Sequence, residues 1–116
     1  MSEFSWPKEK RIRKTKNYQN VQSTGKRWRS HDFIVLYIKT DLEQSRIGIT
    51  VSKKVGNAVR RNRVKRMIRE GVRKEYFLLT KPWDIVIIAR SSAFFSSTEK
   101  IQNQIQSVFK YLSRKL

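Results

Sequence analysis

The sequence predicts a small α+β domain with the element order helix, strands, helix, strand, helix. Three observations carry this prediction. Residues 46–54, RIGITVSKK, alternate apolar with small or polar side chains, as a strand with one buried face does. Residues 57–76 repeat aliphatic side chains at helical spacing. Residues 84–90, DIVIIAR, are almost continuously apolar, as interior strands are, so the strand–helix–strand order predicts a crossover between parallel strands.

The first helix is expected within TKNYQNVQSTG. Thr15 can cap its start and Gly25 can close it. Tyr18 and Val21 lie three residues apart and therefore share one face. In the strand that begins at residue 46, Gly48 leaves two interpretations open, a bulge or the close approach of another backbone.

Residues 27–40 are expected to form one strand, because their centre is aliphatic or aromatic, and DLEQS after them is expected to be a turn. Pro82 marks a break before the later strand. The last helix is expected to start near Ser96 and Glu99, which have the spacing of a capping box. Its apolar stripe consists of Ile101, Ile105, Val108, Phe109 and Leu112.

The charge is strongly one-sided, because 27 Lys and Arg stand against 9 Asp and Glu and give a net charge of +18. Self-repulsion of this size opposes folding unless a polyanion neutralises it. Nucleic acid is the leading partner, since neutralised phosphates release counterions. An anionic membrane is the alternative and would favour an amphipathic helix with bulky apolar residues free to insert. With 38% hydrophobic residues in 116, the chain is expected to fold as one domain.

Several functions are excluded or disfavoured. The absence of cysteine excludes disulfides, thiolate zinc sites and thiol catalysis. His31 is the only histidine, which excludes a ribonuclease mechanism based on two histidines. The carboxylates show no metal-binding spacing, and structural or solubility roles are expected for Asp32, Asp41, Glu43, Glu70 and Asp84. No apolar run approaches ~18 residues and no signal-peptide pattern is present, so a cytoplasmic protein is expected.

The helix predicted from residue 57 has two distinct faces on a wheel of about 100° per residue. Val64, Met67, Ile68, Gly71 and Val72 fall on one side and are expected to be buried. The outer arc is almost entirely cationic, whereas an ordinary soluble helix mixes charges of both signs. It comprises Asn62, Arg63, Lys65, Arg66, Arg69, Arg73 and Lys74, with Glu70 as its one acid. Arginine suits bidentate contact with phosphate, so this helix is predicted to bind RNA or DNA.

The stretch RIGITVSKKVGNAVRRNRVKRMIRE closely resembles the signature of the bacterial ribonuclease P protein component: a strand ending in V-S-K-K, then G-N-A-V, then an R-N-R helix. RIRKTKNYQNV and DIVIIAR also resemble parts of that family, so the likeness covers about residues 10–112. It implies a small α/β sandwich with a left-handed crossover, against the usual rule. Pro7 and the basic run from Lys8 to Lys14 predict that residues 1–12 are a flexible basic segment, so residues 13–116 are expected to form a single RNA-binding domain.

The resemblance also implies a function. The protein would bind a large catalytic RNA, ribonuclease P RNA, and the two together would remove the 5′ leader of precursor tRNA. The RNA would hold the catalytic divalent metal (Mg²⁺), and this chain would bind no cofactor tightly and contribute no catalytic residue. The protein alone is expected to be monomeric. Two other functions stay open from composition alone, a structural RNA-binding protein such as a ribosomal protein and a double-stranded DNA binder. The ordered motifs favour ribonuclease P.

Residue roles follow from the resemblance by position. The residues expected against the catalytic RNA are Lys53, Lys54, Asn57, Arg60, Arg61, Asn62, Arg63, Lys65, Arg66, Arg69 and Arg73. Those expected to bind the leader are Tyr18, Gln22, Leu36, Thr50, Ser52 and Arg90. Two of these depart from the family, which often has aromatic residues where this chain has Gln22 and Leu36. Base stacking is therefore expected to be weaker here or to use other residues.

Overall fold

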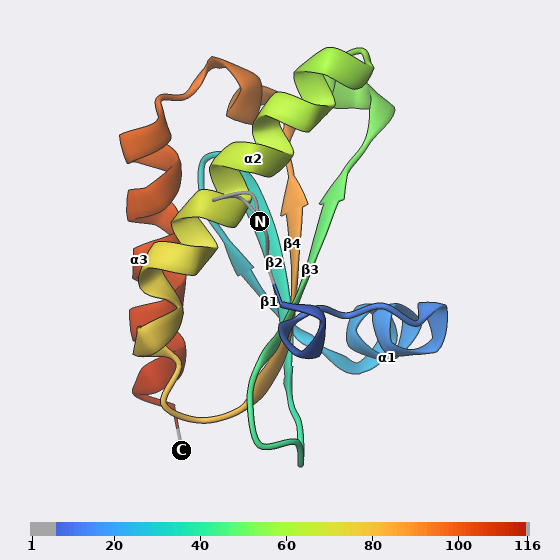
Figure 1. Cartoon of the computed structure of the whole chain (residues 1–116), viewed down its shortest axis with the longest axis vertical. Helices are drawn as coiled ribbons and strands as arrows, with labels where there is room; N and C mark the ends of the chain where they lie inside the picture. The colour runs from blue at the N-terminus through green and yellow to red at the C-terminus, as the bar shows by residue number, and fades with distance from the viewer. Residues whose placement is uncertain (1–6, 116) are drawn as a thin grey trace.

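The computed structural model describes residues 7–115 and confirms the predicted α+β order (Figure 1). Its helices are α1 (Thr15–Thr24), α2 (Ala58–Glu75) and α3 (Thr98–Ser113), and its strands are β1 (Lys26–Arg29), β2 (Phe33–Lys39), β3 (Arg46–Val51) and β4 (Trp83–Ala89). Four short 3₁₀ helices complete it: η1 (Lys8–Lys10), η2 (Lys53–Val55), η3 (Tyr76–Leu78) and η4 (Ser91–Phe95).

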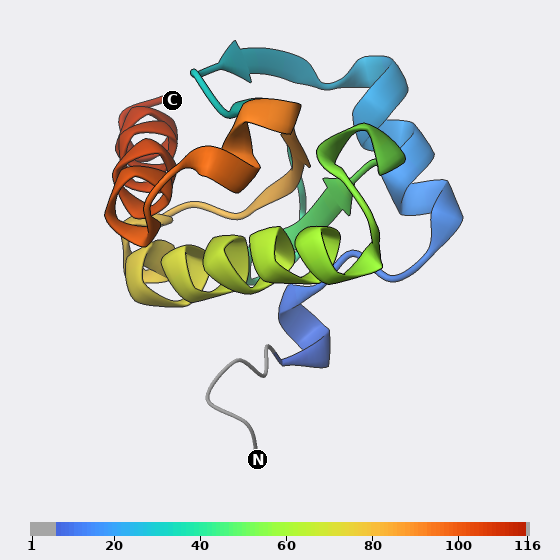
Figure 2. The ribbon, with the colours of Figure 1, turned by 90° about the horizontal axis from the view of Figure 1, so that it is seen from above.

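The strands form one sheet in the order β1-β2-β4-β3. β4 pairs antiparallel with β2 and parallel with β3, and α2 connects the parallel pair, as the strand–helix–strand pattern predicted. The hand of this crossover stays a prediction. α2 and α3 lie on one side of the sheet and α1 lies on the other, so the domain has three layers (Figure 2).

Alternation along the strands assigns side chains to the two faces of the sheet. Ile47 and Val51 of β3 and Ile85 and Ile87 of β4 are buried in the larger core, beneath α2 and α3. The opposite face carries a smaller cluster, in which Val21 of α1 packs on the sheet with Ile12, Leu36 and Val86. α1 covers only part of this second face, and the remaining part is described below as a candidate site.

The expected single strand over residues 27–40 was wrong, because residues 30–32 interrupt it and β1 and β2 form an antiparallel hairpin. Two helix starts also differ from prediction. Ser97, not Ser96, caps α3 by accepting a hydrogen bond from the backbone N–H of Lys100 at 3.1 Å. α1 is preceded by Lys14 and has no side-chain cap, so Thr15 lies inside it.

The expected flexible segment over residues 1–12 needs a correction at its end. Ile12 is buried, and its N–H donates to the carbonyl oxygen of Ile47 at 3.1 Å. Arg11 forms a bridge with Ile47 at the outer edge of β3. The packed domain thus begins before residue 13, whereas residues 1–6 lie outside the described part of the chain.

Asp32 has the structural role that was expected, and it ties the hairpin to the end of the chain. Its buried carboxylate accepts hydrogen bonds from Ser92, Ser96 and Gln104 at 2.7, 2.5 and 2.6 Å. Burial by itself would raise the pKa of Asp32, but the hydrogen bonds from Ser96, Ser92 and Gln104 outweigh it and leave that pKa below its ordinary value. The native state therefore prefers the ionised carboxylate.

Asp32→Asn should lower the free energy of unfolding by about 2–4 kcal/mol at neutral pH, because an amide N–H would then face a donor in a buried site. Since folding lowers this pKa, the contribution is present above the unfolded-state pKa and is lost as pH falls through the folded-state value. Urea unfolding from pH 7 to pH 3 measures both effects. The control is Asp41→Asn at an exposed position, where the change should stay within about 0.5 kcal/mol. Equal losses in the two variants would contradict the role of Asp32.

Candidate nucleic-acid interface

The start of α2 is set by two residues of the G-N-A-V stretch. Gly56 has φ 146°, a conformation that side chains with a Cβ rarely adopt. Asn57 then caps α2, its Oδ1 accepting from the N–H of Arg60 at 3.0 Å. Asn57 was expected at the RNA interface, and although it is exposed, its carbonyl oxygen is already used inside the protein. These two residues direct the helix from the end of β3 across the sheet.

The two faces of α2 lie as the wheel predicted. Val64, Met67, Ile68, Gly71 and Val72 are all buried against the core. The other side points away from it, with Asn62, Arg63, Arg66, Arg69, Arg73 and Lys74 exposed and Lys65 half-buried. The apolar residues of α2 are therefore committed to the fold, and the cations form a surface that we call the cationic face.

Glu70 does little to neutralise the cationic face as a whole. Its carboxylate pairs with Arg73, through a contact of 3.2 Å from Nε, and with Lys74 at 3.7 Å. The hydrogen bond from Arg73 is the main reason that the pKa of Glu70 lies below its ordinary value. Within residues 7–115, no carboxylate forms an ion pair with Arg60, Arg61, Arg63, Lys65 or Arg69. Most of the charge near the helix start is thus available to a polyanion.

The remaining cations expected at this interface lie around the first turns of α2. Lys53 and Lys54 are exposed in η2, directly before the helix. Arg60 is exposed, whereas Arg61 is half-buried and its Nε has no hydrogen-bond partner among the described atoms. The structure therefore brings the expected residues onto one continuous stretch of chain around the start and outer side of α2.

The second candidate surface begins where Tyr18 of α1 lies on β3. A Cβ at position 48 would be 2.6 Å from a ring carbon of Tyr18, so Gly48 is needed for the close approach of an aromatic ring. Burial raises the pKa of the Tyr18 phenol, and a hydrogen bond from the backbone of Ile49 opposes that shift only partly. The ring is half-buried and held at a defined place on the sheet.

Next to Tyr18, one row of side chains across the sheet is only partly covered. The register places Ile34 of β2 beside Ile88 of β4, and Ile88 beside Thr50 of β3. All three are half-buried, whereas the neighbouring row of Leu36, Val86 and Gly48 is buried. We call Ile34, Ile88 and Thr50, together with Tyr18, the open sheet face.

The residues expected to bind a leader fall into two groups. Thr50 lies in the open sheet face, and Ser52 and Arg90 are exposed where β3 and β4 end. Gln22 is exposed on α1, one turn after Tyr18. Leu36 differs from the others, because it is 4% exposed and packs in the cluster with Val21, so it offers almost no surface to a ligand while α1 is in place.

Ile34 and Ile88 were missed as site residues. β2 and β4 are nearly all apolar, so their sequences do not tell which alternate positions face α1 and which of those α1 leaves uncovered. Counting two residues back from Leu36 would have placed Ile34 on the same face.

Elsewhere in residues 7–115, no three His, Cys, Asp or Glu side chains lie close enough to hold a metal ion. Nor is any helix in this part of the chain long and apolar enough to span a bilayer. Asp84, another carboxylate for which a structural role was expected, forms a bidentate pair with Arg46 at 2.9 and 2.6 Å. It therefore fastens the start of β3 to β4.

The fold and these two surfaces define a basic nucleic-acid-binding protein. The family model for Ribonuclease P matches residues 6–113. The ribonuclease P protein component of Desulfosudis oleivorans is 39% identical over 98% of this chain and 94% of its own length, and that of Bacillus velezensis is 40% identical over 91% of each. The chain belongs to the bacterial ribonuclease P protein family.

A solved structure supports the same assignment. It is a Staphylococcus aureus RNase P protein mutant with defective mRNA degradation activity, 36% identical, and the match covers 90% of this chain and 88% of that one with a TM-score of 0.82. The chain is therefore a protein subunit of ribonuclease P, an endoribonuclease that acts in tRNA 5′ maturation, and it associates with ribonuclease P RNA. This assignment decides against the ribosomal and DNA-binding alternatives.

Proposed function

We propose that the two surfaces bind different RNAs. The cationic face of α2 binds ribonuclease P RNA, and the open sheet face binds the 5′ leader of precursor tRNA. The observation that carries this proposal is their placement, because α2 and α1 lie on opposite sides of the sheet. One small domain can thus contact two RNA segments at the same time.

The open sheet face has the chemistry of a single-strand site. Unpaired bases stack on aromatic rings, and the ring of Tyr18 is held in place on Gly48. Ile34 and Ile88 add apolar area beside the hydroxyl of Thr50. Arg90 and Ser52 follow at the ends of their strands, where a cation and a hydroxyl can contact the sugar–phosphate backbone. Gln22 adds an amide where family members often have a second ring.

The chemistry of cleavage is assigned to the RNA. We infer from the family that ribonuclease P RNA would hold the Mg²⁺ ions that supply the hydrolytic chemistry, and that this chain supplies binding and charge rather than a catalytic side chain. Its net charge of +18 supports that role, since two RNAs brought together repel each other unless their phosphates are neutralised. We further propose that the protein alone is monomeric and acts in the cytoplasm.

The contribution of Tyr18 can be tested with a pair of variants. Tyr18→Leu keeps apolar packing on the sheet but removes the stacking ring, and Tyr18→Phe keeps the ring but removes the hydroxyl. The holoenzyme with Tyr18→Leu should bind precursor tRNA roughly 5- to 150-fold more weakly, because one stacked base contributes about 1–3 kcal/mol. Tyr18→Phe should stay within a few-fold of the wild type.

The control for this test is mature tRNA, which has no leader. Its affinity for the holoenzyme should be the same in the wild type and in Tyr18→Leu. If Tyr18→Leu weakens mature and precursor tRNA equally, or weakens neither, the open sheet face does not bind the leader.

A further inference from the structure

Two adjacent phenylalanines of η4 lie outside the surfaces described so far. Phe95 is 81% exposed, and Phe94 is half-buried and contacts it edge-on, with ring centroids 5.2 Å apart and planes at 85°. Ala93 is the one buried residue of η4. A large apolar side chain with this much exposure gains nothing from the core and is unexplained by the fold.

The position of these rings is fixed from both sides. Ser92, before the pair, and Ser96, after it, donate hydrogen bonds to the two carboxylate oxygens of Asp32 at 2.7 and 2.5 Å. Asp32 therefore holds both ends of the short segment that carries Phe94 and Phe95. The rings project from an anchored turn rather than from a loose loop, which lowers the entropy lost when a ligand binds them.

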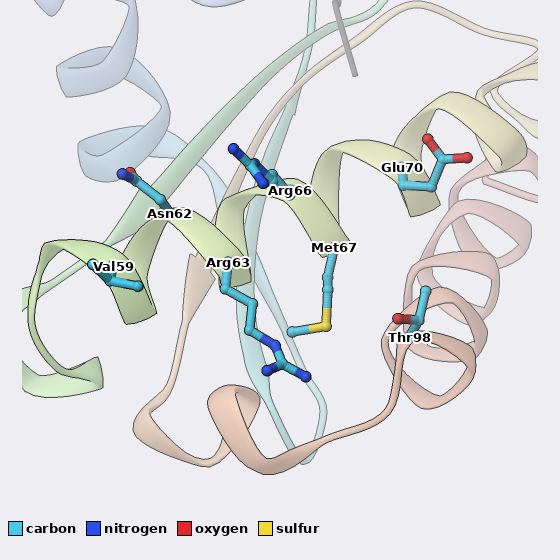
Figure 3. A pocket seen from close by; sticks show the side chains of 7 residues that line it. All are labelled: Val59, Asn62, Arg63, Arg66, Met67, Glu70 and Thr98. Atoms are coloured by element: carbon cyan, nitrogen blue, oxygen red, sulfur yellow. The ribbon is translucent and has the colours of Figure 1, made fainter. Parts of the chain in front are cut away.

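Two arginines near the start of α2 lie over the ring of Phe94. The guanidinium carbon of Arg60 lies 4.7 Å from the centre of the Phe94 ring, and that of Arg63 lies 5.7 Å from it. Arg63 also lines a groove of about 640 Å³ between α2 and the start of α3 (Figure 3). The other lining residues are Val59, Asn62, Arg66, Met67, Glu70 and Thr98.

We propose that Phe95 and Phe94, together with Arg60 and Arg63, form a stacking site for an unpaired nucleotide of RNA, with the adjacent groove receiving the base edge. A flat apolar ring stacks with any base, and the arginines beside it can pair with the flanking phosphates. At the side of the groove where Arg63 and Met67 point, Thr98 of α3 offers a hydroxyl to a base edge (Figure 3). The inference rests on the proposed function, because it extends the RNA-binding face of α2 onto η4.

The surroundings favour RNA over an anionic membrane. A membrane would also attract the arginines and accept Phe95, but the groove beside them contains an amide, a hydroxyl and the carboxylate of Glu70. Glu70 is already paired with Arg73 and Lys74, but lipid chains would leave the amide of Asn62 and the hydroxyl of Thr98 without hydrogen-bond partners, which costs free energy. A nucleotide satisfies polar and apolar groups together.

The test compares Phe95→Ala and Phe95→Trp with Phe77→Ala, all in the full chain. Phe77 is 73% exposed in η3, which follows the far end of the 18-residue helix α2, about 27 Å from its start. Since both side chains are exposed, neither alanine variant should unfold the protein. Phe95→Ala should raise the Kd for ribonuclease P RNA about 5-fold or more, with an unchanged salt slope because no ionic contact is lost. Phe95→Trp should bind at least as tightly as the wild type, and Phe77→Ala should match it.

The same variants identify which RNA supplies the nucleotide. If it belongs to precursor tRNA, Phe95→Ala will leave the Kd for ribonuclease P RNA unchanged and raise the holoenzyme KM for the precursor, which also supports the site. Two results would overturn it: Phe95→Ala matching Phe77→Ala with both RNAs, or lost binding of phosphatidylserine vesicles with no change in RNA binding. A wild type that binds neither RNA would instead overturn the proposed function, and the stacking site with it.

Discussion

Replacing Arg61, Arg63, Lys65, Arg66 and Arg69 with glutamine should weaken binding of ribonuclease P RNA by a factor on the order of 100 or more at physiological salt. Each cation that neutralises a phosphate releases counterions, so each loss lowers the slope of log K against log salt by about 0.7–0.9. Five losses should flatten that slope by about 3.5–4.5 units. The fold should survive, because the buried stripe of α2 is untouched.

A matched control separates local contact from overall charge. Glutamine at five exposed cations away from α2 lowers the net charge by the same amount, and the positions are Lys26, Lys39, Lys81, Lys110 and Arg114. This control should keep most of the affinity and of the salt slope, because only long-range attraction is reduced. Binding titrations of ribonuclease P RNA with both variants, at several salt concentrations, separate local contact from overall charge. Equal losses would mean that α2 attracts RNA without contacting it.

Single substitutions give the same test on a finer scale. Arg63→Ala and Arg66→Ala should each weaken assembly of the holoenzyme and flatten the salt slope by about one contact. An unchanged slope in both variants would place the cationic face outside the RNA interface.

Much of α2 could be predicted from the sequence, because local rules decide it. The spacing of Val64, Ile68 and Val72 has one periodicity, and burial follows it. Gly56 and Asn57 mark the helix start through backbone conformation and capping, which depend on neighbouring residues alone. The cationic face then follows by exclusion from the core, so the surface that we propose for RNA binding could be predicted from the sequence alone.

The open sheet face was harder to predict, since it depends on register between distant segments. Tyr18 was predicted correctly, but in β2 we chose Leu36, which is buried, whereas Ile34, two residues earlier, is partly exposed. Both lie on the same face of the strand, and only the position of α1 decides which one it covers. A strand that is apolar on both faces contains no signal for that difference.

The placement of Phe94 and Phe95 depends on contacts between residues that lie even farther apart in the sequence. Asp32 is joined to Ser92 and Ser96 across 60 and 64 residues of sequence. From the sequence, residues 27–40 looked like one strand, although Ser30, His31 and Asp32 are the kind of polar residues that end one. Nothing local indicated that this turn would anchor η4 and hold Phe95 out of the core.

The second prediction with a large expected effect concerns the rate at which precursor tRNA is cleaved. With ribonuclease P RNA at low magnesium, the protein should raise the rate of precursor cleavage at least about tenfold, which corresponds to about 1.4 kcal/mol in the barrier. The physical reason is charge neutralisation, because the cations of the protein replace part of the Mg²⁺ that would otherwise screen the two RNAs. The stimulation should therefore shrink as magnesium is raised.

The most direct test of the central claim is cleavage of one precursor tRNA by the RNA alone, the protein alone and the two together, at low and high magnesium. We predict no cleavage by the protein alone, a clear gain from the combination at low magnesium, and a smaller gain at high magnesium. Robust cleavage by the protein alone would contradict the assignment of chemistry to the RNA. No gain from the combination at any magnesium concentration would contradict the role of this chain as the subunit that binds both RNAs.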